Sequence, residues 1–383
     1  MAEIVSPTFI LRGHSAPVLC LDLCSKSTVS KLASGAEDGT ARVWDIDTAK
    51  CVRGLKGFDE NTEVTSVCFS GDDLLYVAAG CQVRLFDLRS HDLVLAQSTQ
   101  IGVSAEDEIN HIALNEKRTF LATADDSGHV TVTDLRTNRI FKRFRQRHEN
   151  LATCVQFQPN RSWDVWSGGM DSTLIHWDYS KGCPVEEFPF ATSEQSQNAQ
   201  SVNPPFVHSL EFSPDARLLA AGLGDGSVAL LNVSGKKNAD AERLARKGRS
   251  SSALKARLMD GHSWAVSAVT FPRCERERGP LISGGIDGNI VMWDIPASTA
   301  SEGEWEGVIK RRLHIGRKIN CLTSAFCSAR GSTEAANDST NQADESFLIF
   351  GGGTLLPGQH STDAGKRSAG DIDVFAVSWP GST

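Results

Sequence analysis

The feature that most constrains this chain is a unit at residues 13–45 that opens with Gly-His and closes with Trp-Asp. Between these ends lie three short runs of β-forming residues, at Val18–Leu23, Lys31–Ser34 and Ala41–Trp44. An antiparallel sheet of this size cannot bury its own faces, so it becomes stable only when it stacks against copies of itself. The unit therefore predicts further copies along the chain.

Two further copies are complete, one from Arg147 to Asp178 and one from Gly261 to Asp294. In all three copies a Ser precedes an Asp by four residues, and a Trp follows that Asp by six. A His stands at or beside the start of each copy. The three sets are His14, Ser34, Asp38 and Trp44; His148, Ser167, Asp171 and Trp177; and His262, Ser283, Asp287 and Trp293.

This signature resembles that of the WD40 repeat family, whose units run about 40–45 residues. The resemblance implies an all-β fold, a single seven-bladed β-propeller, in which each complete set forms a buried hydrogen-bonded chain from Asp through His and Ser to Trp. A carboxylate, an imidazole, a hydroxyl and an indole N–H can satisfy one another. A His/Ser/Asp set could also indicate a hydrolase triad, but a triad occurs once beside a cleft. We interpret the recurring sets as structural tetrads.

Four other units depart from the full pattern. We place them at residues 64–90, 108–137 and 207–233, with a last unit in three strands between Lys318 and Ser378. Seven repeats use roughly 280–315 residues, so the 383-residue chain is expected to form one domain, 1–383, with long insertions. Polar composition predicts mobile insertions near 191–206, 234–257, 328–345 and 357–370. Residues 8–12 resemble the N-terminal strand that closes the last blade in this family.

One column of the first strand in each unit carries small residues. Cys20, Cys154 and Cys321 share it, and the aligned residues elsewhere are Ser66, His111, Ser209 and Ala268. A crowded inner strand requires small side chains, and a free Cys behaves as a small hydrophobe. We interpret these thiols as part of the core.

Composition excludes several function classes. The formal net charge of −8 argues against binding of duplex nucleic acid by the chain as a whole. No apolar stretch approaches the roughly 18 residues that span a membrane, and the N-terminus has no signal-peptide pattern. The ten cysteines include no Cys-x-x-Cys pair and fit a reducing compartment, so we expect the nucleus, the cytoplasm or both. The glycines at 351–353 lack the Lys of a phosphate loop. We expect no catalytic residue, cofactor or metal.

Residues 234–257 contain eight basic and two acidic residues. We interpret this segment as a solvated loop. The alternatives are a nuclear-import signal, a contact with an acidic partner, or a nucleic-acid site whose binding would depend steeply on salt.

Two neighbouring units end in the same tripeptide. Residues 74–89 end in Phe86-Asp87-Leu88-Arg89, and residues 121–136 end in Thr133-Asp134-Leu135-Arg136. These stretches resemble the sixteen-residue box, ending Trp-Asp-x-Arg, of WD40 substrate receptors that dock on the damaged-DNA-binding adaptor of a cullin-4 type cullin–RING ubiquitin ligase. The resemblance implies that Arg89 and Arg136 contact the adaptor, while Asp87, Leu88, Asp134 and Leu135 hold the turn. Phe86 and Thr133 depart from the Trp of that box, and an ordinary strand-end turn is the alternative.

The sequence thus predicts a non-enzymatic scaffold for protein interactions, and most sharply a ligase substrate receptor that binds the adaptor and an unidentified substrate protein. Outside its complex the chain is expected to be monomeric. The alternatives are a scaffold for another nuclear or cytoplasmic complex and a propeller enzyme. No unrepeated acid–base pair or metal-ligand set in the sequence supports an enzyme.

Overall fold

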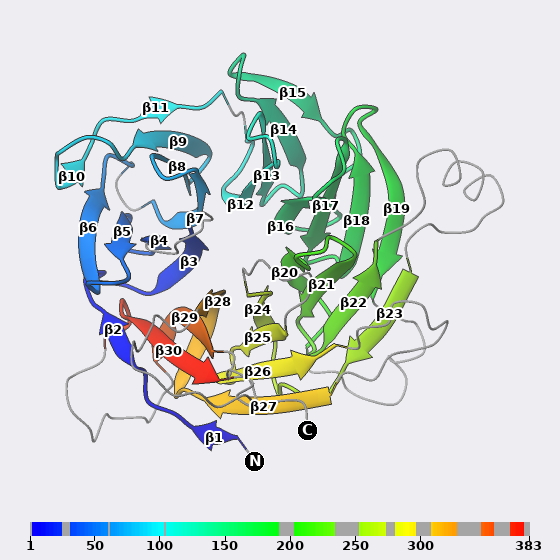
Figure 1. Cartoon of the computed structure of the whole chain (residues 1–383). Helices are drawn as coiled ribbons and strands as arrows, with labels where there is room; N and C mark the ends of the chain where they lie inside the picture. The colour runs from blue at the N-terminus through cyan, green and yellow to red at the C-terminus, as the bar shows by residue number, and fades with distance from the viewer. Residues whose placement is uncertain are drawn as a thin grey trace, which may run out of the picture.

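The computed structural model describes residues 2–24, 31–59, 62–102, 105–190, 203–233, 253–272, 280–295, 308–327, 346–355 and 368–378. Seven sheets stand around a central axis as the blades of a propeller (Figure 1). The prediction of an all-β, seven-bladed propeller is confirmed. Within these ranges no helix has the length and apolar character needed to cross a membrane.

Each blade takes its strands largely from one stretch of chain. Blades one to three contain β3 (Val18–Leu23), β4 (Lys31–Ala36), β5 (Ala41–Asp45) and β6 (Lys50–Leu55); β7 (Val64–Ser70), β8 (Leu74–Ala79), β9 (Gln82–Asp87) and β11 (Thr99–Gln100); and β12 (Ile109–Leu114), β13 (Phe120–Asp125), β14 (Val130–Asp134) and β15 (Arg139–Arg143). Blades four to six contain β16 (Ala152–Phe157), β17 (Asp164–Gly169), β18 (Thr173–Asp178) and β19 (Cys183–Pro189); β20 (Val207–Phe212), β21 (Leu218–Leu223), β22 (Val228–Asn232) and β23 (Ala253–Leu258); and β24 (Val266–Thr270), β25 (Leu281–Gly285), β26 (Asn289–Asp294) and β27 (Val308–His314). Blade seven contains β28 (Arg317–Cys327), β29 (Ser346–Leu355) and β30 (Ile372–Ser378).

The N-terminal strand closes the ring. β2 (Phe9–Leu11) pairs antiparallel with β30, with Phe9 opposite Val374 and Leu11 opposite Ile372 (Figure 1). The predicted closing strand is confirmed. A shorter strand that the sequence did not predict, β1 (Glu3–Ile4), runs parallel to β27 and adds a fifth strand to blade six. Because the first and last parts of the chain share a sheet, separating them requires breaking backbone hydrogen bonds.

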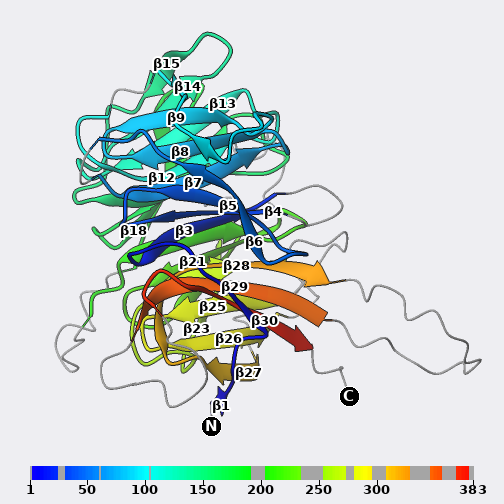
Figure 2. The same cartoon turned by 90° about the vertical axis from the view of Figure 1, so that its left-hand side faces the viewer.

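The connection from blade two to blade three crosses back to blade one. After β9, the chain places β10 (Val94–Leu95) parallel to β6 of blade one, and β11 then returns to the edge of β9. Seen from the side in Figure 2, the sheets of blades one and two lie one over the other. The crossing segment therefore covers the outer edges of both blades.

Every inner strand carries a β-bulge at the same place. A bulge redirects the side chain of its extra residue. The bulged residues are Leu19, Thr65, Asn110, Thr153, His208, Ser267 and Asn320.

Five of these side chains donate a hydrogen bond to a backbone carbonyl of the next blade. Asn110, for example, donates to the Ala152 oxygen at 3.0 Å, and Asn320 donates to the Val18 oxygen at 3.3 Å, which joins blade seven to blade one. These hydrogen bonds connect neighbouring blades around the axis.

The column of small residues follows directly after these bulges. Cys154 and Cys321 are buried, and burial raises the pKa of each thiol to about 12. A Cβ atom added at Gly352 would lie 2.8 Å from both Cys321 Sγ and Val18 Cγ1, so the column is tightly packed. His111 is the exception in size, and burial lowers its pKa to about 4, which keeps the ring neutral at physiological pH.

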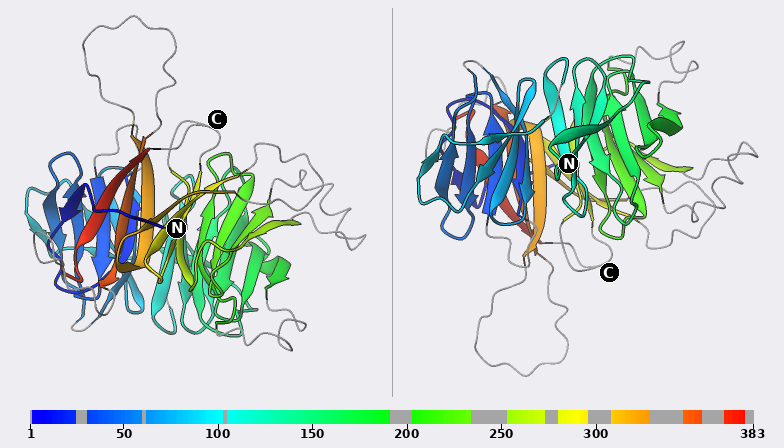
Figure 3. Two further views of the ribbon diagram at one scale, coloured as in Figure 1. Left: turned by 90° about the horizontal axis from the view of Figure 1, so that it is seen from below. Right: turned by 90° about the horizontal axis from the view of Figure 1, so that it is seen from above.

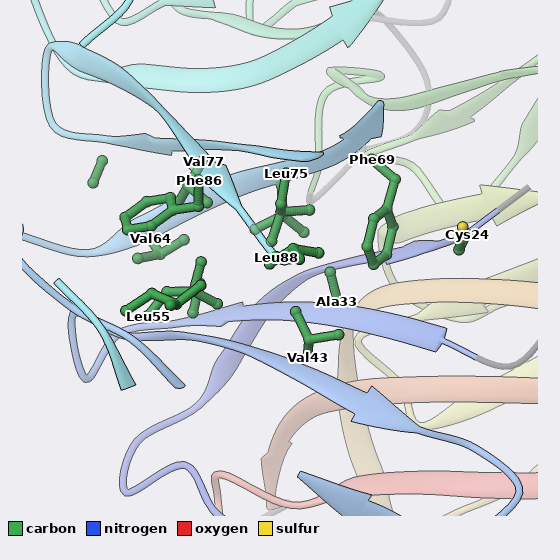
Figure 4. Packing of buried hydrophobic residues seen from close by; sticks show 14 residues of the cluster. Cys24, Ala33, Val43, Leu55, Val64, Phe69, Leu75, Val77, Phe86 and Leu88 are labelled. Carbon is green, nitrogen blue, oxygen red and sulfur yellow. The ribbon is translucent and has the colours of Figure 1, made fainter. Parts of the chain in front are cut away.

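The hydrophobic core lies between adjacent blades. Figure 4 shows one such cluster, in which Val43 and Leu55 of blade one face Leu75 and Phe86 of blade two. Blade seven, which lacks the tetrad, instead buries an ion pair between Arg317 Nε and Asp373 Oδ2 at 3.3 Å. Both side chains are fully buried, and Arg317 also donates to the carbonyl oxygens of Gly353 and Asp371.

The predicted insertions fall mainly outside the described residues. This holds for residues 191–202, 234–252, 328–345 and 356–367. The predicted boundary of the 234–257 insertion is wrong at its C-terminal end, because residues 253–257 belong to β23, the outer strand of blade five. Ala256 and Leu258 are buried against blade six, and the basic residues around them obscured this alternation in the sequence.

Candidate functional site

The three tetrads form hydrogen-bonded chains inside their blades. In blade one, His14 Nδ1 lies 3.1 Å from Asp38 Oδ2, and His14 Nε2 lies 2.8 Å from Ser34 Oγ. The Trp44 indole N–H donates to the same Ser34 oxygen at 2.8 Å. The other two sets repeat this geometry, with His-to-Ser and Trp-to-Ser distances between 2.7 and 2.8 Å, at His148, Ser167, Asp171 and Trp177 and at His262, Ser283, Asp287 and Trp293.

Burial decides what the tetrads can do. The side chains of His14, His148 and His262 are fully buried, and the Ser residues of the three sets are fully buried too. A substrate therefore cannot reach a Ser oxygen. Burial alone would raise the pKa of Asp287, but the hydrogen bond and charge of His262, with two backbone amides, lower it to about 2. The Asp carboxylate of the tetrad is therefore ionised at neutral pH, and its hydrogen-bond partners lie within the blade.

The propeller presents two faces, seen edge-on in Figure 3. The inner strands all begin at one of them, where the His–Asp pairs of the tetrads lie, and we call it the tetrad face. The inner strands end at the opposite face, where the Asp-Leu-Arg turns follow β9 and β14, and we call it the box face. An axial channel of about 910 Å³, lined by all seven inner strands, lies between the two faces.

The first Asp-Leu-Arg turn is held by its own side chains. Asp87 Oδ1 accepts the backbone N–H of Arg89 at 3.0 Å and its Nε at 2.9 Å, while Asp87 Oδ2 lies 2.5 Å from Arg89 Nη2. The hydrogen bonds from Arg89 lower the pKa of Asp87 to about 2. Arg89 remains 68% exposed.

The second turn repeats this geometry on blade three. Asp134 Oδ1 accepts the Arg136 backbone N–H at 2.9 Å and Nε at 3.1 Å, and Oδ2 accepts from Nη2 at 2.9 Å. The hydrogen bonds from Arg136 likewise lower the pKa of Asp134. The Arg136 side chain is 66% exposed, and its guanidinium lies 5.8 Å from the centre of the Phe120 ring.

The remaining box residues lie in the core. Phe86 is fully buried and Leu88 is 8% exposed, and both pack in the cluster between blades one and two (Figure 4). Thr133 is also fully buried, and Leu135 is partly buried. Phe86 therefore cannot contact a partner as a surface residue, because it occupies the inward place that Trp takes in a full unit. Of the box residues, Arg89, Arg136 and the Asp87 carboxylate are well exposed, whereas Asp134 is only 8% exposed.

Sequence reasoning missed an aromatic cluster beside Arg136. Phe141 and Trp163 are 40% and 43% exposed, and they pack against Phe120 and Tyr179. Trp163 lies in the turn before β17 and Phe141 lies on β15, so the cluster joins blades three and four. The sequence signal was the run Ile140-Phe141 on a strand otherwise rich in basic residues.

No chemistry-bearing cluster stands beside these surfaces in the described residues. Among them, no three His, Cys, Asp or Glu side chains are grouped to hold a metal ion. The channel contains His208, whose pKa is lowered by burial. The arrangement therefore offers surfaces for binding, and the exposed groups with the most distinctive geometry are the two arginines.

Comparison with known proteins identifies the repeats. The WD40 model, described as "WD domain, G-beta repeat", matches residues 5–45, 141–178, 198–231 and 254–294. These matches include the three complete units and blade five. The ring closure and the recurring tetrads agree with this assignment.

Several characterised proteins are similar to this chain. The WD repeat-containing protein 53 homolog of Dictyostelium discoideum is 30% identical over 82% of this chain and 88% of its own length. The order of motifs in the sequence, most clearly over residues 13–180 and in blade six, also resembles WD repeat-containing protein 53. Human NEDD1 is 26% identical over 55% of this chain, and mouse pre-mRNA-processing factor 19 is 27% identical over 46% of it. The match covers 29% and 34% of those two proteins.

Fold, repeats and relatives together support a scaffold for protein interactions. Seven blades with turns at both ends make a broad platform. The family of this chain follows from two findings, the extent of its match to the Dictyostelium protein and the matches of its repeats. The chain belongs to the WD40 repeat family.

Proposed function

We propose that this chain is a substrate receptor of a cullin-4 type cullin–RING ubiquitin ligase and that its box face binds the damaged-DNA-binding adaptor. The observation that carries the proposal is the pair of matching Asp-Leu-Arg turns on neighbouring blades. Each turn presents an arginine that is about two-thirds exposed, at 68% for Arg89 and 66% for Arg136. The substrate protein would bind elsewhere on the platform.

The arginines are prepared for a partner. In each turn the Asp carboxylate accepts from Nε and Nη2, which fixes the plane of the guanidinium. Nη1 donates no hydrogen bond within the described residues and can donate to a carbonyl or carboxylate of another chain. A guanidinium already held in one orientation loses less conformational freedom on binding.

The test is binding of the purified adaptor to the full chain carrying Arg89→Ala and Arg136→Ala. Both side chains are exposed, so the free energy of unfolding should change by no more than about 0.5 kcal/mol. If the arginines are hot spots of the interface, their replacement should weaken adaptor binding by about 2 kcal/mol or more. Calorimetry or co-purification measures binding, and circular dichroism measures folding.

The chain supplies a matched control. Asp215-Ala216-Arg217 is another Asp-x-Arg turn on the box face, in blade five, with Arg217 51% exposed and its backbone N–H bonded to Asp215. Arg217→Ala combined with Lys310→Ala removes two cations from other blades and should leave adaptor binding unchanged. Equal adaptor binding by the wild type and the Arg89/Arg136 variant would refute the assignment of the boxes. Absence of binding by the wild type would refute the receptor function and favour a scaffold for another complex.

The compartment is part of the same proposal. A ligase receptor of this kind would work in the nucleus, the cytoplasm or both. Fractionation of cells that express the tagged chain tests this. Recovery only in a secreted or membrane fraction would contradict it.

A further inference from the structure

The surface around Arg136 is more than an exposed arginine. Arg136, Arg139, Phe141 and Lys142 of blade three lie with Trp163 of blade four at the box face and its outer edge, and we call these five residues the blade 3–4 patch. Its two rings are 40% and 43% exposed. Large apolar side chains exposed together mark interaction sites more often than scattered ones do.

Local structure holds the two rings in place. Phe141 is the bulged residue of β15, where the register with β14 shifts, so its side chain turns toward blade four. Its ring centre lies 5.1 Å from that of Phe120 and 6.3 Å from that of Trp163. The Trp163 carbonyl accepts the backbone N–H of Tyr179 at 2.9 Å. Both rings are therefore ordered before a partner binds, so little conformational entropy is lost on binding.

The blade-three segment beside the rings is basic, while the carboxylates of Asp164 and Asp178 lie on the blade-four side, near Tyr179. Residues 136–147 contain six basic residues and no acidic residue. Arg143 pairs with Glu106, and Arg136 pairs with Asp134. Within the described residues Arg139 and Lys142 form no ion pair. A hollow of about 480 Å³ on blade three is lined by Asp134, Thr137, Arg139, Ile140 and Phe141.

The first box has no such surroundings. No aromatic ring lies under the Arg89 guanidinium among the described residues. The exposed apolar residues that follow it are Leu93 and Val94 on the crossing segment, at 73% and 53% exposure. Trp, Tyr and Arg are enriched at the residues that dominate binding energy. The second box, whose arginine lies over the Phe120 ring that Phe141 packs against, therefore has the composition of an anchor.

We infer that the blade 3–4 patch is the principal anchor for the adaptor, and that it receives an adaptor segment in which an apolar side chain is flanked by carboxylates. The apolar side chain packs on Phe141 and Trp163, and the carboxylates face Arg136, Arg139 and Lys142. This inference rests on the proposed function. Charge complementarity selects the acidic segment. A polynucleotide is disfavoured by the net charge of −8 on the whole chain.

The first arm of the test removes the rings. Full-length chain with Phe141→Ala and Trp163→Ala is titrated against purified adaptor, and Kd should rise at least about 30-fold, the equivalent of a hot spot of about 2 kcal/mol. Trp264→Ala is the matched control, because Trp264 is 50% exposed and precedes β24 on the tetrad face. Its Kd should equal that of the wild type.

The second arm leaves the rings in place, so it holds even if the ring variant unfolds. Arg139→Glu with Lys142→Glu should raise Kd at least about 10-fold, because two carboxylates now face those of the partner. The adaptor affinity of this variant should also depend less on salt concentration than that of the wild type. Lys50→Glu with Lys56→Glu makes the same change of charge at exposed residues of blade one and should have no effect.

The outcomes separate the two proposals. If the ring and charge variants bind the adaptor like the wild type while Arg89→Ala/Arg136→Ala does not, the anchor is refuted and the receptor function stands. If wild-type chain does not bind the adaptor at all, the receptor function fails and the anchor with it. Binding of a single-stranded oligonucleotide that the ring variant abolishes, with adaptor affinity unchanged, would assign the patch to nucleic acid and overturn the inference.

Discussion

The tetrad of blade six permits a quantitative test in which two tryptophans of one blade are compared. Trp293 is 1% exposed and its indole N–H donates to Ser283 Oγ at 2.8 Å, while Ser283 also bonds to His262 at 2.7 Å. Trp293→Phe removes the N–H and leaves the Ser oxygen with one buried unsatisfied site, which costs about 1–3 kcal/mol. The smaller ring also leaves a void of roughly 40 Å³, which adds about 1 kcal/mol. We expect a loss of about 2–4 kcal/mol in the free energy of unfolding.

Urea unfolding followed by circular dichroism measures this loss. Trp264→Phe is the control, because the Trp264 side chain is half exposed, and its effect should stay within about 0.5 kcal/mol. A double variant with Ser283→Ala should be less destabilised than the sum of the single changes, because the orphaned oxygen is gone. If Trp293→Phe unfolds at the same urea concentration as Trp264→Phe, the indole hydrogen bond does not stabilise the blade.

Three further predictions concern other parts of the fold. Deletion of residues 1–12 removes β2 and leaves the edge of β30 unpaired, so the truncated chain should elute as an aggregate in size-exclusion chromatography. Deletion of residues 1–7 removes only β1 and should leave a monomer. Identical elution of the two truncated chains would contradict the role of β2. Arg317→Met removes the cation that pairs with the buried Asp373 carboxylate and should lower stability by about 3–5 kcal/mol. Arg311→Met at the exposed pair with Glu3 should cost less than about 1 kcal/mol, and similar unfolding midpoints for the two variants would refute this. Because the folded-state pKa of Asp287 is lowered to about 2, its carboxylate stabilises the fold above about pH 4, and this stabilisation is lost as the pH falls toward 2. In acid titrations, the unfolding free energy of Asp287→Asn should therefore decline less steeply over this range than that of the wild type. Parallel declines of the two proteins would contradict this prediction.

Much of the architecture could be predicted because it depends on residues that recur. The His14, Ser34, Asp38 and Trp44 pattern reports on one blade through local spacing, and its repetition implies the ring. The closing strand could be predicted because a propeller otherwise leaves the edge of its last blade unpaired. Blade seven was harder to predict, because Arg317 and Asp373 stabilise it in place of a tetrad and neither belongs to the repeat pattern.

The candidate site was only half visible in the sequence. The two Asp-Leu-Arg turns could be found, because a carboxylate two residues before an arginine is a local pattern. Whether a side chain near them is exposed depends on neighbouring blades. Phe86 proved to be buried against blade one, while Phe141 is exposed at the junction with blade four.

The sequence by itself determined the repeat and the turns that carry Arg89 and Arg136, since each depends on contacts within one unit of chain. The number of blades followed from counting the units along the chain. Only the tertiary structure decided which surfaces remain open. Bulges in the inner and outer strands redirect side chains across blade boundaries, as Phe141 shows, and no spacing along the chain encodes that approach. The blade 3–4 patch exists because residues from two blades meet, and a meeting between blades is a property of the closed ring.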